Sequence, residues 1–259
     1  MKKIKIIVLF SLSIFSVNLL YSVNSNWPIG TGKVVPKNRF EIGLFQPLQY
    51  GLTDNIELST FPFWNALIPN FFLKKSWDNL LSGFFATEHG IYYPTPFLRA
   101  FAKDGIGLLP PLSKVPHIFV LTNTAYLSFY INKHIMITPA FTLYLSENFG
   151  KSDYPTIDFV LAYHRMSVFH NKASGRTGLD FDGNIFYNLF YNFDFDLFIL
   201  NHYRNNWAFE NSFLLSYHFS KGFRVSAGYK FALSPMPYDK SAPDWKFFPL
   251  FDCQWGIDF

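Results

Sequence analysis

The end of the chain alternates strictly between apolar and polar side chains. From Phe251 to Phe259 the odd positions carry Phe, Cys, Trp, Ile and Phe, and the even positions between them carry Asp, Gln, Gly and Asp. Because successive side chains of an extended strand point to opposite faces, this period of two predicts a β-strand with one apolar and one polar face. Such a strand requires different surroundings on the two sides of its sheet.

Composition indicates what those surroundings are. The chain contains 33 Phe, 15 Tyr and 6 Trp, and charged residues make up only 15% of it, against about 25% in ordinary soluble domains. Mean hydropathy is nevertheless near neutral, at +0.10, and beyond the N-terminus no apolar run is long enough for a membrane helix. Alternating strands can face lipid and still average to this value, so an all-β membrane protein is expected.

The N-terminus has the parts of a secretory signal. Met1 to Ile6 is basic, Ile7 to Leu20 is apolar with polar interruptions, and Val23 and Ser25 supply small side chains before a cleavage site. We expect residues 1–25 to be a cleaved signal peptide. An uncleaved anchor helix is the alternative, although the apolar run is short for a membrane span. Export excludes cytoplasmic enzymes.

Charge and cysteine content exclude further classes. The formal net charge is +4, but removing Lys2, Lys3 and Lys5 with the signal peptide leaves 19 basic and 18 acidic residues. No basic surface for nucleic acid is therefore expected. The single cysteine, Cys253, excludes an intrachain disulfide and lies on the apolar face of the last strand, where it is expected to pack.

Alternation recurs along the chain. Residues 26–37 are rich in Gly and Pro and are expected to form a periplasmic lead or a plug inside a barrel. Residues 39–44 predict the first strand, and the clearest strand pairs flank turns at 132–134 and 220–222. Further strands are predicted at 56–60, 70–77, 84–93, 156–170, 184–192 and 196–204, with a loop at 171–180. Between Pro94 and Pro116 the spacing favours a short amphipathic helix, with an irregular loop as the alternative.

Two stretches carry a family resemblance. Phe259, preceded at every second position by Ile257 and Trp255, resembles the closing strand of Gram-negative outer-membrane β-barrels, in which this pattern is the signal read by the barrel-assembly machinery. The run RFEIGLFQPLQYGLTDNIEL, from Arg39, resembles the opening hairpin of poorly characterised, porin-like barrels. The resemblance implies an outer-membrane location, with membrane lipid and lipopolysaccharide as neighbours, and it carries no activity. A soluble or secreted β-sandwich is the alternative.

We therefore predict that residues 38–259 form a single closed antiparallel transmembrane β-barrel of about twelve strands, with ten as the alternative. Closure is required because every backbone polar group must be paired in lipid. If the first and last strands pair antiparallel, Arg39 and Asp258 should lie within salt-bridge range. The charges on the face opposite the aromatic residues are predicted to lie in the lumen: Arg39, Glu41, Glu210, Arg224, Lys230, Asp252 and Asp258.

The expected function is that of a narrow non-specific pore or a surface structural protein. A lipid-modifying enzyme, similar to a lipid A deacylase or a phospholipase, is the alternative, since such barrels carry a His-x-Ser pair on one strand face. The sole such motif, His218-Phe219-Ser220, runs into a short turn, and His164 and His170 have no serine at the required spacing. We predict no catalytic residue, cofactor or metal site, and the oligomeric state is left open.

Overall fold

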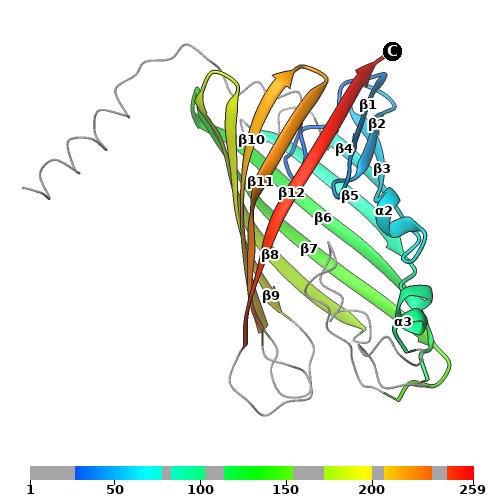
Figure 1. Ribbon diagram of the computed structural model, residues 1–259. Coiled ribbons are helices and arrows are strands. Elements are labelled where there is room, and N and C mark those ends of the chain that lie inside the picture. Colours follow the sequence, from blue (N-terminus) through cyan, green and yellow to red (C-terminus); the bar gives the residue numbers. More distant parts are fainter. Residues whose placement is uncertain (1–26, 78–82, 103–113, 154–171, 200–206, 235–243) are drawn as a thin grey trace, which may run out of the picture.

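The computed structural model describes residues 27–77, 83–102, 114–153, 172–199, 207–234 and 244–259. The strands are β1 Arg39–Gly43, β2 Leu48–Gly51, β3 Ile56–Thr60, β4 Asn70–Trp77, β5 Phe84–Tyr92, β6 His117–Asn132, β7 Ile135–Phe149, β8 Ala173–Phe186, β9 Leu189–Ile199, β10 Trp207–Ser220, β11 Phe223–Ser234 and β12 Asp244–Asp258. Two short helices, α2 Pro62–Asn65 and α3 Thr95–Phe101, lie in connections between strands (Figure 1).

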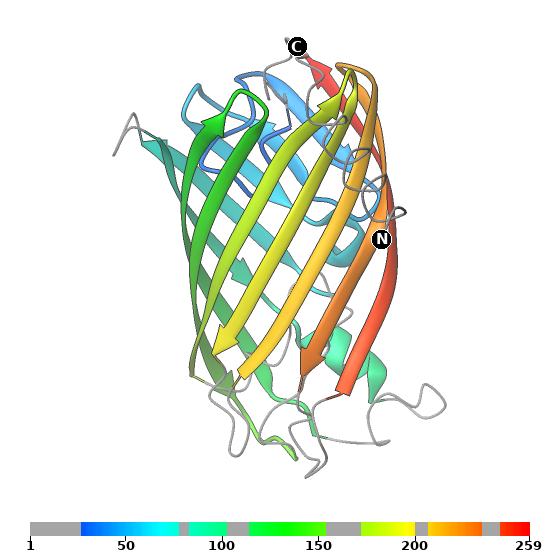
Figure 2. The ribbon, with the colours of Figure 1, turned by 90° about the vertical axis from the view of Figure 1, so that its left-hand side faces the viewer.

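The strands pair antiparallel in chain order, and β12 pairs with β1 to close a barrel of twelve strands. The predicted fold class is therefore confirmed. At the closing seam Arg39 lies opposite Asp258 and Ile42 opposite Trp255. Figure 2 shows the tall wall that the long strands from β6 to β11 form on one side of the barrel.

Side-chain polarity is inverted relative to a soluble protein. On β6, Phe119 and Leu121 face outward and are 42% and 51% exposed, whereas Ile118 and Thr122 face the interior and are buried. Polar side chains of the interior bond to each other between strands, as Ser128 does to Thr138 (2.7 Å). An apolar exterior around a polar interior is typical of transmembrane barrels.

The two ends of the barrel differ in their connections. The end that carries the C-terminus, here called the near end, has short turns at 133–134, 187–188 and 221–222 (Figure 1). The opposite, far end has longer connections, which include 61–69 with α2 and 93–116 with α3. The three two-residue turns between described strands thus lie on one side, which agrees with the predicted turns at 132–134 and 220–222.

One region of the sequence prediction was wrong. Residues 171–180 were expected to be a loop, but β8 begins at Ala173 and pairs directly with β7. The run 184–192, expected to be one strand, contains the turn between β8 and β9 at 187–188. Residues 48–51, for which no strand was predicted, form β2. The strand predicted at 156–170 lies outside the described residues.

An apolar cluster fills the far end of the interior. Phe97 and Leu98 of α3 are buried there against Phe72, Ile118 and Val120 of the wall, so the helix predicted after Pro94 is confirmed. Phe198 and Ala208, on β9 and β10, belong to the same cluster and bring it across the barrel. Within the described ranges, no helix is both long enough and apolar enough to cross a bilayer.

Candidate functional site

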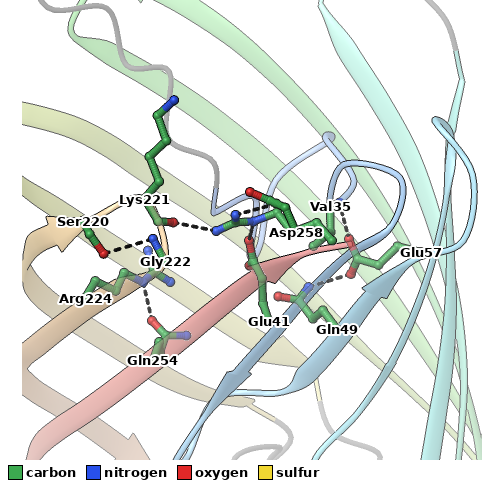
Figure 3. A network of polar contacts seen from close by, with 11 residues as sticks. Val35, Glu41, Gln49, Glu57, Ser220, Lys221, Gly222, Arg224, Gln254 and Asp258 are labelled. Atoms are coloured by element: carbon green, nitrogen blue, oxygen red, sulfur yellow. Dashed lines mark hydrogen bonds and ion pairs between the residues drawn. The ribbon is translucent and has the colours of Figure 1, made fainter.

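Buried charges hold the near end of the barrel together (Figure 3). The Arg39 guanidinium donates from Nε to Glu41 Oε1 (2.6 Å), from Nη1 to Asp258 Oδ1 (2.9 Å) and from Nη2 to the Lys221 carbonyl oxygen (2.8 Å). The predicted contact between Arg39 and Asp258 is thus confirmed. The two carboxylates differ in surroundings, because the Glu41 side chain is 1% exposed and that of Asp258 is 70% exposed.

Residues 27–37, the N-terminal segment, cross the inside of the barrel at the near end. The Trp27 ring lies between two guanidinium groups, 5.1 Å from that of Arg39 and 4.4 Å from that of Arg224. Further along, the Gly32 N–H donates to Ser128 Oγ on β6 (2.7 Å). The Val35 N–H then donates to Glu57 Oε2 on β3 (2.9 Å). The segment therefore contacts strands on several sides of the near-end opening.

A close backbone approach fixes this path. A Cβ atom at Gly32 would lie 1.9 Å from the Phe84 carbonyl oxygen on β5, so no larger residue fits without a shift. Lys33 adds a side-chain contact, since its Nζ donates to Tyr130 Oη (2.6 Å). The segment is held inside the near end by main-chain and side-chain bonds to several strands.

The middle of the interior is polar and charged. Two ion pairs cross neighbouring strands: Arg176 Nε lies 3.1 Å from Asp196 Oδ1, and Lys230 Nζ lies 2.7 Å from Glu210 Oε2. Further charged side chains line the same cavity, among them Lys74, Glu88, Asp180, Asp182 and Asp194. Mixed charges of both signs therefore face the cavity.

The cavity has a volume of about 700 Å³, which lies within the range of small-molecule binding sites. Trp27 and Thr31 of the N-terminal segment line it at the near end, and Phe198 of the apolar cluster lines it toward the far end. Apolar residues line the cavity as well, among them Trp64 on α2 and Phe248 on β12. The cavity thus has a charged part and an apolar part.

The residues predicted as lumen charges lie on the inner face, with one qualification. Glu41, Glu210 and Asp252 are buried, and Arg224 and Lys230 line the cavity. Asp258 lies at the rim, where it contacts Arg39 but remains mostly exposed. Sequence reasoning missed several inner charges: Glu57, Lys74, Glu88, Arg176, Asp180, Asp182, Asp194 and Asp196. The two-residue spacing of Asp194 and Asp196 could have indicated a shared inward face.

The residues of the predicted assembly signal all face outward. Trp255, Ile257 and Phe259 are exposed, and Phe259 most of all, at 80%. Its N–H donates to the Asn38 carbonyl oxygen (3.0 Å), which ties the chain end to the start of β1.

The His-x-Ser motif is not arranged as a catalytic pair. The pairing of β10 with β11 shifts between His218 and Ser220. The His218 ring instead stacks on Phe190, with ring centres 4.2 Å apart, and meets the edge of Trp27. Ser220 Oγ accepts the Gly222 N–H (3.2 Å) in the near-end turn. His164 and His170 lie outside the described residues.

In the parts of the chain that the structure describes, no group of three or more His, Cys, Asp or Glu side chains could hold a metal ion. No protein-family model matches the chain, and no curated protein sequence matches it.

Proposed function

We propose that this protein is an integral outer-membrane β-barrel that takes up a small solute into its interior and is held closed at the periplasmic end by the N-terminal segment. In single-chain bacterial barrels the short turns are periplasmic and the long loops extracellular. By this rule the near end faces the periplasm.

The observation that carries the proposal is the combination of an internal plug with a charged cavity. Residues 27–37 bond to Glu57 on β3 and to Ser128 on β6, and the Trp27 ring contacts Arg39 and Arg224. A purely structural barrel needs no such closure. A cavity of about 700 Å³ lined by side chains of both signs suits a polar or amphipathic solute.

A permanently open, non-specific pore is the second candidate. The mixed charges of the interior favour it, because they would give little ion selectivity. The plug argues against it, since an open pore requires a continuous water path past Trp27 and the two arginines that enclose its ring.

Conductance in planar bilayers tests the proposal with two glycine variants. In Gly32→Val the new side chain would collide with the Phe84 carbonyl group, so the plug should leave its path and conductance should appear or rise. Gly175→Val is the control, because a Cβ atom at Gly175 meets its nearest neighbour at 3.9 Å. Wild type and control should conduct little.

Two results would count against this function. Steady, equal conductance of wild type and Gly32→Val would favour the open pore. No conductance from any of the three well-folded proteins would favour a structural role.

A further inference from the structure

The barrel wall is incomplete on one side of β12. β12 pairs with β11 from Asp244 to Trp255, but with β1 only from Gln254 to Asp258. The cause is strand length, since β1, β2 and β3 have five, four and five residues and β12 has fifteen. In Figure 1 β12 runs along the barrel while β1 to β3 lie only near its C-terminal end. Among the described residues, no strand pairs with Asp244–Cys253 on this side.

The backbone groups of this free edge can be assigned. The Cys253 carbonyl oxygen accepts the Leu44 N–H, on the β1 side, whereas the Gly256 N–H donates to Gly222, on the β11 side. Because alternate residues of a strand direct their polar groups to opposite neighbours, the odd-numbered residues of β12 face the free side. Pro249 is one of them, and it has no N–H to offer.

Between Phe247 and Phe251, strand β12 is apolar on both faces. Its first half contains the run Phe247-Phe248-Pro249-Leu250-Phe251. The alternation with buried Asp252 and Gln254 turns Phe248 and Leu250 inward, where they line the cavity. Leu250 lies opposite Gly228, which lies opposite Leu214, a further residue of the cavity wall. An apolar surface therefore continues from the outside of the barrel around the edge into the cavity.

Aromatic side chains border the other side of the cavity. Phe45 contacts Phe63, Phe63 contacts Trp64, and Trp64 contacts Phe97 of α3, with ring centres 5.5, 5.2 and 6.0 Å apart. Phe45, Phe63 and Trp64 line the same cavity as Phe248 and Leu250. Phe45 and Phe63 are also exposed on the surface of the protein. The cavity thus reaches an apolar border between β12 and α2.

We propose that this gap is a lateral opening, through which an amphiphile with a single linear hydrocarbon chain enters from the membrane and binds with its chain between β12 and α2. Its polar end then lies among the inner charges, such as Lys230, which is paired opposite Phe248. The inference rests on the proposed function and names its solute class and route. Non-helical backbone is tolerated at membrane depth where it lines a cavity, and Phe248 to Phe251 of this edge line the cavity.

A strand from a second copy of the chain is the rival occupant of the edge. Strand addition depends on a continuous ladder of main-chain hydrogen bonds. Pro249 interrupts that ladder on the free side, and prolines at sheet edges act against such pairing. The apolar inner face of Phe248 and Leu250 also has no role in a strand added at the edge.

Photo-crosslinking in lipid nanodiscs tests the inference. The probes are sixteen-carbon chains with a terminal diazirine, one with a carboxylate and one with an ammonium headgroup, and labelled residues are mapped by mass spectrometry. We expect label at the inward residues Phe248 and Leu250 and at Phe63 and Trp64. In the double variant Phe248→Gln, Leu250→Gln this labelling should fall roughly tenfold, because apolar contacts of that size are lost.

Met136→Gln is the matched control. Met136 also lines the cavity, but from β7, away from the free edge, and labelling should be unchanged in this variant. Heat-dependent gel mobility checks that every variant is folded. Specific labelling by either probe supports the lateral opening and identifies the preferred headgroup.

Three results would overturn the inference. The first is label spread evenly over outward residues such as Leu121 and Phe141, which is ordinary contact with surrounding lipid. The second is equal labelling of wild type and double variant. The third is a stable dimer that Pro249→Val strengthens, which assigns the edge to a second copy. If Gly32→Val conducts more than wild type and one of these three results is also found, the proposed function stands while this inference falls.

Discussion

Arg39 and Glu41 lie side by side on the inner face of β1, and both are almost fully buried. Glu41 Oε2 has no hydrogen-bond partner among the described residues, so the Arg39 guanidinium is what balances this carboxylate. A buried ion pair adds little net stability, because both charges lose their hydration, but loss of one partner leaves the other uncompensated. The third member of the network, Asp258, remains in contact with solvent.

We therefore predict that Arg39→Met lowers the free energy of unfolding by about 3–5 kcal/mol, and that adding Glu41→Gln restores most of the loss. Both variants lack the contact between Arg39 and Trp27, so the difference between their free energies of unfolding reports the cost of the uncompensated Glu41 carboxylate. Asp258→Asn should cost less than about 1 kcal/mol, since exposed pairs contribute little. Urea unfolding in lipid vesicles, followed by tryptophan fluorescence, measures all three. A double variant as unstable as Arg39→Met would contradict this account.

At the scale of strands, prediction succeeded where apolar and polar residues alternate over a long run. β6, β7, β10, β11 and the second half of β12 have such patterns, and each was correctly predicted to be a strand. β8 begins with Ala, Ser, Gly, Arg and Thr, a stretch that was predicted as a loop because its outward positions Ala173, Gly175 and Thr177 are small or polar. Pairing with β7 and β9, which lie far off in sequence, makes this segment a strand.

Features that depend on several elements could not be predicted. The lengths of β1 to β3 determine the gap beside β12, and the run Phe247 to Phe251 alone does not show that its inner face meets a cavity. The path of the N-terminal segment likewise depends on distant partners, such as Phe84 for Gly32 and Glu57 for Val35. The composition of residues 26–37 predicted either a periplasmic lead or a plug inside the barrel, and it could not distinguish between the two.

Phe259, which directly follows β12 and continues its alternation, offers a prediction about assembly. Because the Phe259 side chain is 80% exposed, Phe259→Ala should change the stability of the refolded barrel by less than about 0.5 kcal/mol. If Phe259 is part of an assembly signal, the same variant should accumulate severalfold less in the outer membrane of cells. Phe247→Ala is the control, since Phe247 is 63% exposed on the same face of the same strand. Equal accumulation of the two variants would argue against a terminal signal.

At the scale of the whole molecule, the near end and the far end of the barrel differ in several ways. The two-residue turns, the N-terminal segment and the buried Arg39 lie at the near end, whereas longer connections and the apolar cluster lie at the far end (Figure 1). The lateral gap beside β12 begins where the pairing with β1 stops and continues toward the far end. If the far end faces the outside of the cell, an amphiphile from the outer part of the membrane meets the gap first, and the plug separates it from the periplasm.

This orientation predicts which connections a reagent can reach from outside. With Cys253→Ser as background, Lys151→Cys introduces a thiol just after β7 at the far end, and Lys133→Cys introduces one in the turn between β6 and β7 at the near end; both positions are exposed. A membrane-impermeant maleimide added to intact cells should label Lys151→Cys, and should label Lys133→Cys only after the outer membrane is permeabilised. The reverse order of labelling would mean that the near end faces the outside of the cell, with the N-terminal segment at the cell surface. Equal labelling of both thiols before permeabilisation would mean that no membrane separates the two ends, and the outer-membrane location would be wrong.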